Sequence, residues 1–350
     1  MKQSPLFDCL PPERVTGSVM GWTTAVSFGN PESEFQAAAG GIVVTDHSMF
    51  GRIEVTGKDR LDLLHRLSTN SLEGLPPGST ASTVFVSDKG RIIDRVIVSV
   101  REDSLLLITS PGSELFLTRW IEKYTITEDI RFRIITDDTV MISLIGPRMI
   151  STLSAVLNFP PGGNSSVSLV HRGLDLSIVR IQEGTSEVAR IITGIAGAPG
   201  LAAIPGSLPG ARWIGWSAYE GIRISRMIPA SPQELNDAYN PFECGLRDSI
   251  SFTKGCYIGQ EVIARLDTYG KIKRQLVRIT SANVPRGGTP IPLLGKGGDA
   301  GMITSMTDVP FGGQYLGLAV ARPDIAAPGD TLDARGTLVI VVADGASSST

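Results

Sequence analysis

The chain has 350 residues, of which 42% are hydrophobic and 19% are charged, and its formal net charge at pH 7 is −3. This length and composition predict a globular protein with two or three domains and a substantial core. The small negative charge excludes a global basic field for nucleic acid, so any RNA contact would need a local basic patch.

The first half of the chain predicts a mixture of strands and helices. Residues 1–40 are irregular apart from a short helix at 32–39. A cap at Thr56 or Asp59 starts a helix that carries leucines on one face, and Asp88-Lys89-Gly90 joins two strands as a hairpin. Strands are predicted at 41–46, 51–56, 83–87, 92–100, 105–109, 131–136 and 140–145, with a further helix at 113–123. Strands followed by helices in this mixture indicate an α+β fold.

The second half is richer in turns. Residues 160–210 are rich in turn residues, and within them 194–210 predicts a loop interrupted by a weak helix. A helix follows at 216–226. From about residue 272 strands alternate with Gly/Pro turns, which predicts a small barrel or sandwich. The Ser-rich end at 347–350 is predicted to be disordered.

Cysteine usage argues against a disulfide framework. Cys9, Cys244 and Cys256 are far apart, no C-x-x-C pair occurs, and the three histidines are scattered. This pattern favours a reducing compartment and predicts no preformed zinc or iron–sulfur site. The N-terminus lacks the apolar stretch of a signal peptide, and no run of about 18 apolar residues occurs. A cytoplasmic protein without a membrane span is therefore predicted.

The run KGCYIGQE at 254–261 carries the most chemistry of any segment. It holds a lone cysteine between two glycines, with two charges and an amide. The glycines allow a tight bend or a close approach to a ligand. Lys254 would favour the thiolate of Cys256 if the two side chains approach. On the residues alone, a Gly-containing turn with a buried, inert cysteine is an equal alternative.

This run, followed by Ala264-Arg265 and by YGKIKR at 269–274, resembles the signature of the YgfZ family. YgfZ proteins are folate-binding relatives of the glycine cleavage T protein, which is an aminomethyltransferase. The resemblance implies tetrahydrofolate or a folate derivative as cofactor. It also implies iron–sulfur client or assembly proteins as partners, in cluster assembly or repair, with tRNA as a further partner.

Other segments, at 4–8, 50–57, 216–229 and 241–246, resemble the T protein family. The resemblance implies an α+β, T protein-like fold around a central folate channel. A folate-binding region would span 1–268, with a discontinuous first domain at 1–50 and 140–268. A ferredoxin-like second domain would occupy 51–139, and a C-terminal β-barrel 272–345.

The sequence departs from the T proteins at three places. The run GRIIDR at 90–95 stands where T proteins have GGIIDD, whose second Asp serves the transfer at the folate. Arg95 cannot act as a base or stabilise a developing iminium. Asp94 cannot simply replace it, because strand alternation turns Asp94 to the opposite face, where it is a folate contact or a solvated or structural strand residue. Ser225 replaces a pterin-gripping Glu, and the run 108–110 lacks an Asn.

The resemblance also suggests which residues contact folate. Phe50 and Tyr219 fall where YgfZ proteins place folate-contacting tryptophans, and Arg223 lies on the same helical face as Tyr219. On the residues alone, the two rings are equally well core aromatics, and Arg223 an ordinary surface pair. The full set of predicted folate contacts is Phe50, Tyr219, Arg223, Asp94, Tyr257, Gln260 and Glu261.

The predicted function is that of a folate-binding, YgfZ-type accessory protein for iron–sulfur cluster assembly or repair. In it Cys256 is an exposed reactive thiol activated by Lys254. A basic run follows the signature, as a solvated face or a phosphate contact, at Lys271, Lys273, Arg274 and Arg278. The alternatives are a tetrahydrofolate-dependent aminomethyl- or methyltransferase, and a module that has lost folate and binds only proteins or tRNA. Arg95 and Ser225 argue against the enzyme.

Overall fold

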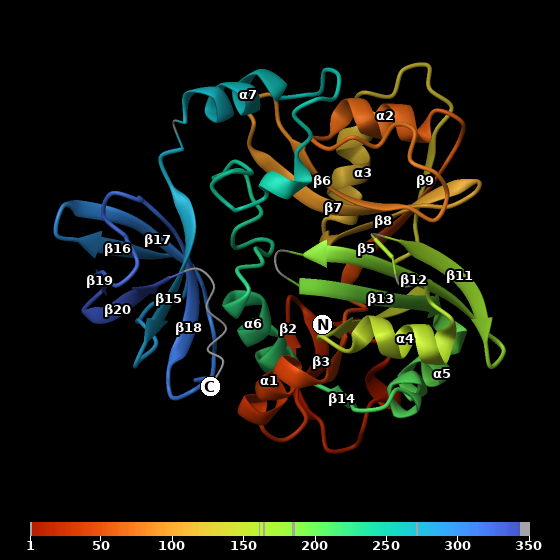
Figure 1. The fold of residues 1–350 in the computed structure, drawn as a ribbon, viewed down its shortest axis with the longest axis horizontal. Coiled ribbons are helices and arrows are strands. Elements are labelled where there is room, and N and C mark those ends of the chain that lie inside the picture. The colour runs from red at the N-terminus through yellow and green to blue at the C-terminus, as the bar shows by residue number, and fades with distance from the viewer. Residues whose placement is uncertain (1, 161, 164, 184–185, 271, 344–350) are drawn as a thin grey trace. The chain divides into compact units, whose positions relative to one another are not determined.

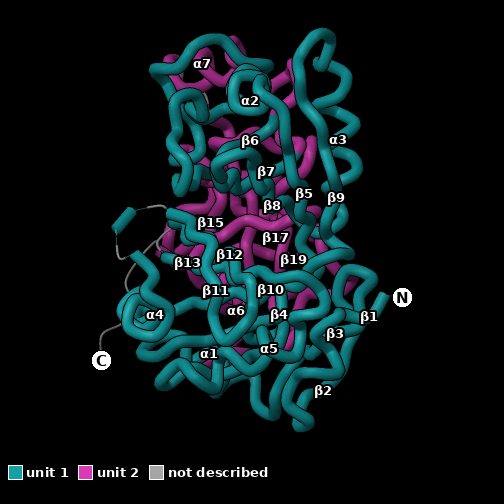
Figure 2. Tube along the Cα trace, turned by 90° about the vertical axis from the view of Figure 1, so that its right-hand side faces the viewer, with its two compact units in different colours: residues 1–85, 94–219, 248–258 teal, residues 86–93, 220–247, 259–350 magenta. Residues whose placement is uncertain are grey.

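The computed structural model describes residues 2–160, 162–163, 165–183, 186–270 and 272–343. They fall into two compact units (Figure 2). Unit 1 comprises residues 1–85, 94–219 and 248–258, and unit 2 comprises residues 86–93, 220–247 and 259–350. Lys271 and the Ser-rich end at 347–350, which the sequence predicts to be disordered, lie outside the described residues.

The sheets of unit 1 give it most of its framework (Figure 1). A three-stranded sheet has the order β1-β3-β2, with β1 Lys2–Gln3, β2 Val15–Val19 and β3 Trp22–Ser27. A six-stranded sheet has the order β11-β12-β13-β10-β4-β14: β4 Ile42–Asp46, β10 Thr139–Ile145, β11 Ser166–His171, β12 Leu174–Glu183, β13 Ser186–Gly194 and β14 Ala211–Trp213. A five-stranded sheet has the order β6-β7-β8-β5-β9: β5 Phe50–Thr56, β6 Thr80–Val86, β7 Ile92–Val100, β8 Ser104–Pro111 and β9 Arg131–Ile134.

Helices α4 and α5 pack against the six-stranded sheet because each turns apolar side chains toward it. The largest core of unit 1 joins the six-stranded sheet to two helices, through residues such as Leu153 and Leu157 of α4 and Leu201 of α5. The α-helices are α1 Pro31–Gly40, α2 Arg60–Leu67, α3 Glu114–Glu122, α4 Met149–Leu157, α5 Ala198–Ala203, α6 Trp216–Ser225 and α7 Gln260–Tyr269. The 3-10 helices are η1 Phe7–Cys9, η2 Ile195–Gly197, η3 Ile204–Ser207 and η4 Arg247–Ser249.

Unit 2 contains a closed barrel, as the sequence predicts for its C-terminal part. Its strands are β15 Gln275–Ser281, β16 Ile291–Gly295, β17 Gly298–Met306, β18 Tyr315–Ala321, β19 Thr331–Ala334 and β20 Thr337–Val342, and they close in the order β15-β18-β17-β16-β19-β20. Small and branched side chains fill the interior, where Ile279, Leu293 and Ala319 are fully buried. The predicted mixture of α and β structure with a C-terminal barrel is confirmed.

Two regions differ from the prediction. Residues 1–40 contain the hairpin β2–β3, whose turn places Met20 at φ 48° and Gly21 at φ 80°. Methionine is rare at positive φ, so the sequence carries only half of the usual hairpin signal. The turn-rich region at 160–210 also contains three strands that the sequence analysis does not predict, β11, β12 and β13, which lie between residues 166 and 194.

Candidate functional site

Three strands of unit 1 carry a charged side chain beside the apolar core. Arg95 on β7, Glu183 on β12 and Arg190 on β13 each lie two residues from a buried isoleucine. Alternate residues of a strand share a face, so the charged groups point the same way as the isoleucines. Those isoleucines, Ile97, Ile181 and Ile192, belong to one apolar cluster drawn from both the five-stranded and the six-stranded sheet.

The carboxylate of Glu183 binds both guanidinium groups through a single oxygen. Arg95 Nη2 and Arg190 Nη2 each donate a hydrogen bond to Glu183 Oε1 at 2.8 Å. The side chains of Arg95, Arg190 and Glu183 are 12%, 4% and 4% exposed. Burial raises the pKa of Glu183, but the charges of Arg190 and Arg95 outweigh it, so the pKa is lowered. Two cations against one carboxylate leave this triad with one net positive charge.

An aromatic group adjoins the triad through Arg190, whose guanidinium carbon lies 5.5 Å from the centre of the Phe50 ring. The ring of His47 lies 4.6 Å from that of Phe50 and 4.4 Å from that of Tyr219. The ring of Trp216, at the start of α6, lies 5.1 Å from that of Tyr219. The structure therefore brings Phe50 and Tyr219 into one group, although they are 169 residues apart by their numbers.

His47 is the polar member of the aromatic group. Its Nδ1 lies 2.7 Å from the hydroxyl oxygen of Ser143, which is the cross-strand neighbour of Arg190. Burial, with a smaller effect of Arg190, holds the pKa of His47 well below its ordinary value, so the imidazole is neutral. Two nitrogen atoms here are buried without a hydrogen-bond partner among the described residues: His47 Nε2 and Arg190 Nε.

Asp94 turns away from the triad, as strand alternation predicts. Ser110 on β8 donates to it twice, from its N–H to Oδ2 at 3.0 Å and from its hydroxyl to Oδ1 at 2.6 Å, and the Arg95 N–H donates to Oδ1 at 2.9 Å. Burial raises the pKa of Asp94 to about 6. Asp94 is 1% exposed, so the solvated alternative is wrong.

The side chain of Lys254 binds backbone carbonyls at the end of a helix. Its ammonium donates to three backbone carbonyls that follow the end of α2 or lie in its last turn: those of His65, of Ser68 at 2.6 Å and of Asn70 at 3.0 Å. Burial lowers the pKa of Lys254 to about 8. All three ammonium protons are therefore engaged. Lys254 thus holds the end of α2, and the activation of Cys256 by Lys254 stays a prediction.

Cys256 is exposed, whereas Cys9 is half-buried and Cys244 is buried. The alternative in which Cys256 is a buried packing residue is therefore wrong. Tyr257 next to it is buried, with the Lys254 ammonium 5.1 Å from the centre of its ring, and burial raises its pKa to about 12. Contact of Tyr257 with folate stays a prediction.

The end of the signature run belongs to unit 2. Gly259 has φ +78°, and a Cβ there would lie 2.5 Å from the carbonyl oxygen of Ser87, so the glycine is required where α7 begins. Glu261 has an 85% exposed side chain and forms a surface ion pair with Arg265 at 2.8 Å. Gln260 is half-buried. Folate contacts of Gln260 and Glu261 stay predictions.

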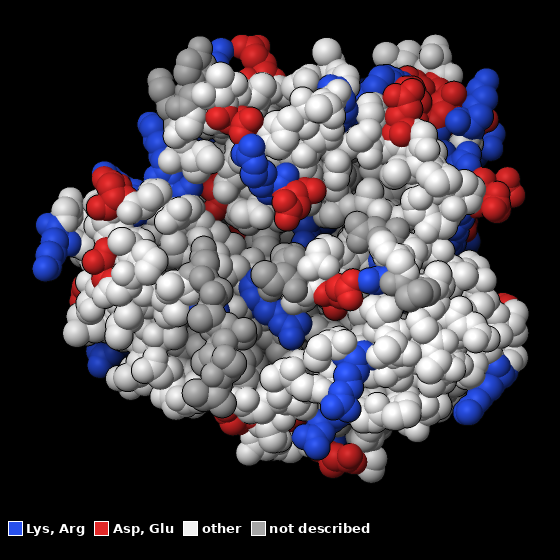
Figure 3. Space-filling model, viewed as in Figure 1, with Lys and Arg blue, Asp and Glu red and all other residues white. Residues whose placement is uncertain are grey.

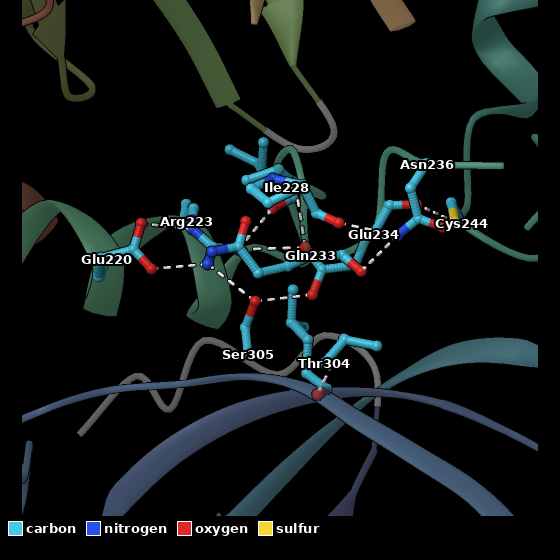
Figure 4. A network of polar contacts seen from close by, with 12 residues as sticks. Glu220, Arg223, Ile228, Gln233, Glu234, Asn236, Cys244, Thr304 and Ser305 are labelled. Atoms are coloured by element: carbon cyan, nitrogen blue, oxygen red, sulfur yellow. Dashed lines mark hydrogen bonds and ion pairs between the residues drawn. The ribbon is translucent and has the colours of Figure 1, made fainter. Parts of the chain in front are cut away.

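Arg223 lies in a buried network of unit 2 (Figure 4). Its Nε and Nη2 each donate to Glu220 at 2.6 Å, and Nη2 also donates to the hydroxyl oxygen of Ser305 at 2.9 Å. Its Nη1 lies 3.5 Å from Glu234 Oε2 and 3.4 Å from the carbonyl oxygen of Ile228. Arg223 is 1% exposed. The alternative in which Arg223 forms an ordinary surface pair is therefore wrong, and contact of Arg223 with folate stays a prediction.

The basic run after the signature is also partly engaged. Arg278 on β15 donates to the carbonyls of Ser225 at 2.6 Å and Ala343 at 3.0 Å, and Lys273 is exposed. Basic and acidic side chains are interspersed on the face in Figure 3. No cluster of potential metal ligands occurs among the described residues, and none of their helices is long and apolar enough to cross a membrane.

Sequence reasoning missed three residues of the site: His47, Glu183 and Arg190. Glu183 and Arg190 lie on strands that the sequence analysis did not predict in this turn-rich region. The sequence signal for Arg190 lies in Ser186–Gly194. In this strand Arg190 falls on the same face as the apolar residues Val188 and Ile192. A charged residue at an inward position of an apolar strand is costly unless it is paired, and it therefore marks a buried partner.

Comparisons with known proteins point to one family of aminomethyltransferase-like proteins. The model of the GCVT N-terminal domain matches residues 13–162. A putative transferase of Arabidopsis thaliana, described as chloroplastic, is 32% identical over 87% of this chain and 71% of its own length. An aminomethyltransferase of Thermotoga neapolitana is 24% identical over 96% of both chains. A crystal structure of aminomethyltransferase T from Bartonella henselae has a TM-score of 0.83 over 98% of this chain and 97% of its own, at 16% identity. The predicted T protein-like fold is confirmed.

Proposed function

Because this chain belongs to the GCVT family of aminomethyltransferase-like proteins, we propose that it binds a reduced folate in unit 1 and does not transfer an aminomethyl group. We further propose that it is a YgfZ-type accessory protein of iron–sulfur cluster assembly or repair. Its free cysteines suit a reducing compartment, for which we propose the cytoplasm.

The side chains of this site in unit 1 are of the chemical types that bind a folate. Folate has a flat ring, which aromatic side chains bind by stacking, and a tail with carboxylates, which guanidinium groups bind by charge-assisted hydrogen bonds. Phe50, Trp216 and Tyr219 supply rings, and Arg95 supplies a partly exposed cation. The buried nitrogens of His47 and Arg190 that have no described partner are a further sign of a polar ligand.

The pairing of Arg95 with Glu183 carries the second part of the proposal. An aminomethyl transfer centre needs a group that accepts a proton or stabilises positive charge. Here the corresponding position holds a cation, in a triad with one net positive charge, and this charge opposes a developing iminium. Asp94 does not compensate for the loss, because three donors already bind its carboxylate on the other face of β7.

We expect tetrahydrofolate binding to depend on the aromatic group. The double variant Phe50→Ala/Tyr219→Ala should bind roughly tenfold more weakly, since each stacking face contributes about 0.5–1.5 kcal/mol beyond area burial. Isothermal titration calorimetry of the purified protein measures this. Phe116→Ala, which removes a 61% exposed ring on α3, is the matched control. Equal affinity of the double variant and the wild type would refute this site.

The alternative function is a tetrahydrofolate-dependent aminomethyl- or methyltransferase. The names of the relatives favour it. An assay with tetrahydrofolate and an aminomethylated carrier protein separates the two functions. Formation of methylenetetrahydrofolate at the rate of a true aminomethyltransferase would establish the alternative.

The exposure of Cys256 supports the accessory role. We expect Cys256→Ser to fold as the wild type and to bind folate with the same affinity. It should nevertheless fail to restore the activity of iron–sulfur enzymes in cells that lack a homologue. Cys9→Ser is the control. Full restoration by Cys256→Ser would show that the thiol has no part in the function. The engagement of Arg278 by backbone carbonyls weakens the case for tRNA and favours protein clients as partners.

A further inference from the structure

The polar cluster around Arg95 has more hydrogen-bond donors than acceptors. Glu183 Oε1 accepts from two arginines at once, and Arg190 Nε is buried with no partner among the described residues. His47 Nε2 is in the same state, and it carries the ring hydrogen whenever Ser143 donates to Nδ1. Buried donors without partners are costly, so the cluster lacks an acceptor.

Arg95 is the member of this cluster that a ligand can reach. Its side chain is 12% exposed, whereas those of Glu183 and Arg190 are 4% exposed and His47 is 1% exposed. Its side-chain hydrogen bond within the described residues uses one of its five N–H groups, on Nη2, which binds Glu183. Glu183 thus fixes the orientation of Arg95 and leaves further donors for a ligand.

The charges in this cluster favour one kind of ligand group. The triad has one net positive charge, and the neutral imidazole of His47 does not change it. A cationic one-carbon unit, such as an iminium, is repelled here. An oxygen with lone pairs is attracted, and a hydrogen bond from a guanidinium to such an oxygen is among the stronger ones in proteins.

We propose that Arg95 contacts an acceptor oxygen of the bound folate, either the formyl oxygen of a formylated folate or a carboxylate of the glutamate tail. Glu183 and Arg190 are positioning residues for Arg95. This inference rests on the proposed folate binding and deepens it, since it names the folate group that the site selects.

Three probes and two variants test it by calorimetry. The probes are 5-formyltetrahydrofolate, 5-methyltetrahydrofolate and 5-formyltetrahydropteroate, which lacks the glutamate. Arg95→Met keeps the length of the side chain and removes its donors, and Glu183 keeps its bond to Arg190, so the variant should fold. Arg101→Met is the matched control: it removes a half-buried arginine that directly follows β7 and whose Nη1 lies 4.0 Å from Glu54 Oε1.

If Arg95 binds the formyl oxygen, Arg95→Met weakens both formyl compounds roughly tenfold and leaves the methyl compound unchanged. If it binds the glutamate, Arg95→Met weakens both glutamate-containing compounds equally and leaves the pteroate unchanged. Either result supports the inference. An effect of Arg95→Met no larger than that of Arg101→Met on every probe overturns it while folate binding stands. Failure of the wild type to bind any of the probes overturns the proposed function as well.

Discussion

Replacing Arg223 with methionine is expected to lower the free energy of unfolding by about 3–5 kcal/mol, the usual effect of removing one partner of a buried ion pair. Glu234 is completely buried, and the side chain of Glu220 is 16% exposed. Without Arg223 both carboxylates lose their cation, and Ser305, which donates to Glu234 Oε1 at 2.7 Å, cannot replace it. Urea unfolding of the purified variant measures the loss.

Two further variants show that the buried charge is the cause. Arg322→Met removes an arginine whose side chain is 43% exposed and paired with Asp324 in the same unit, and it should leave the urea midpoint nearly unchanged. The triple variant Arg223→Met/Glu220→Gln/Glu234→Gln should regain much of the loss, because no unpaired carboxylate remains. If Arg223→Met is as stable as the wild type but binds tetrahydrofolate more weakly, the network is not structural and Arg223 acts on the ligand.

Lys254→Met is expected to destabilise the protein by about 3 kcal/mol. The change leaves three carbonyl oxygens, those of His65, Ser68 and Asn70, without the ammonium that now donates to each of them. A hydrogen bond to a charged group contributes about 1.5–3 kcal/mol, and the avoided desolvation of the ammonium offsets part of the combined loss. Hydrogen exchange should also show faster opening of α2 and the segment after it.

Lys273→Met is the control for this experiment, because Lys273 is exposed in the same sequence region. It should leave both the urea midpoint and the exchange rates unchanged. A Lys254→Met protein with wild-type stability but slower alkylation of Cys256 would instead support the prediction that Lys254 activates the thiol.

Sequence patterns predicted well those elements whose residues carry a local signal. The strand at 92–100 and the helix at 216–226 agree with β7 and α6 almost to the residue, because alternation and helical periodicity are properties of neighbouring residues. The β2–β3 hairpin was not predicted, because its turn has Met20 at a positive-φ position where glycine or asparagine is usual.

The site was harder to predict than the fold. Phe50 and Tyr219 came from a family resemblance, and the structure adds that His47 contacts both rings. The partners of Arg223 and Lys254 could not be predicted from local sequence patterns. Ser305 is 82 positions from Arg223, and the carbonyls that bind Lys254 are at least 184 positions away from it. Helix periodicity places a side chain on a face, but it does not say what the rest of the chain brings to that face.

The single oxygen of Glu183 that serves two arginines limits how this lineage can evolve. An aspartate at position 95, as in a transfer enzyme, would place a second carboxylate near Glu183 with only Arg190 to neutralise both. Such a sequence would be selected against before any catalytic gain, so Glu183 would have to change first or at the same time. The two positions are thus expected to be epistatic, and an aspartate at position 95 would require a coupled change at Glu183.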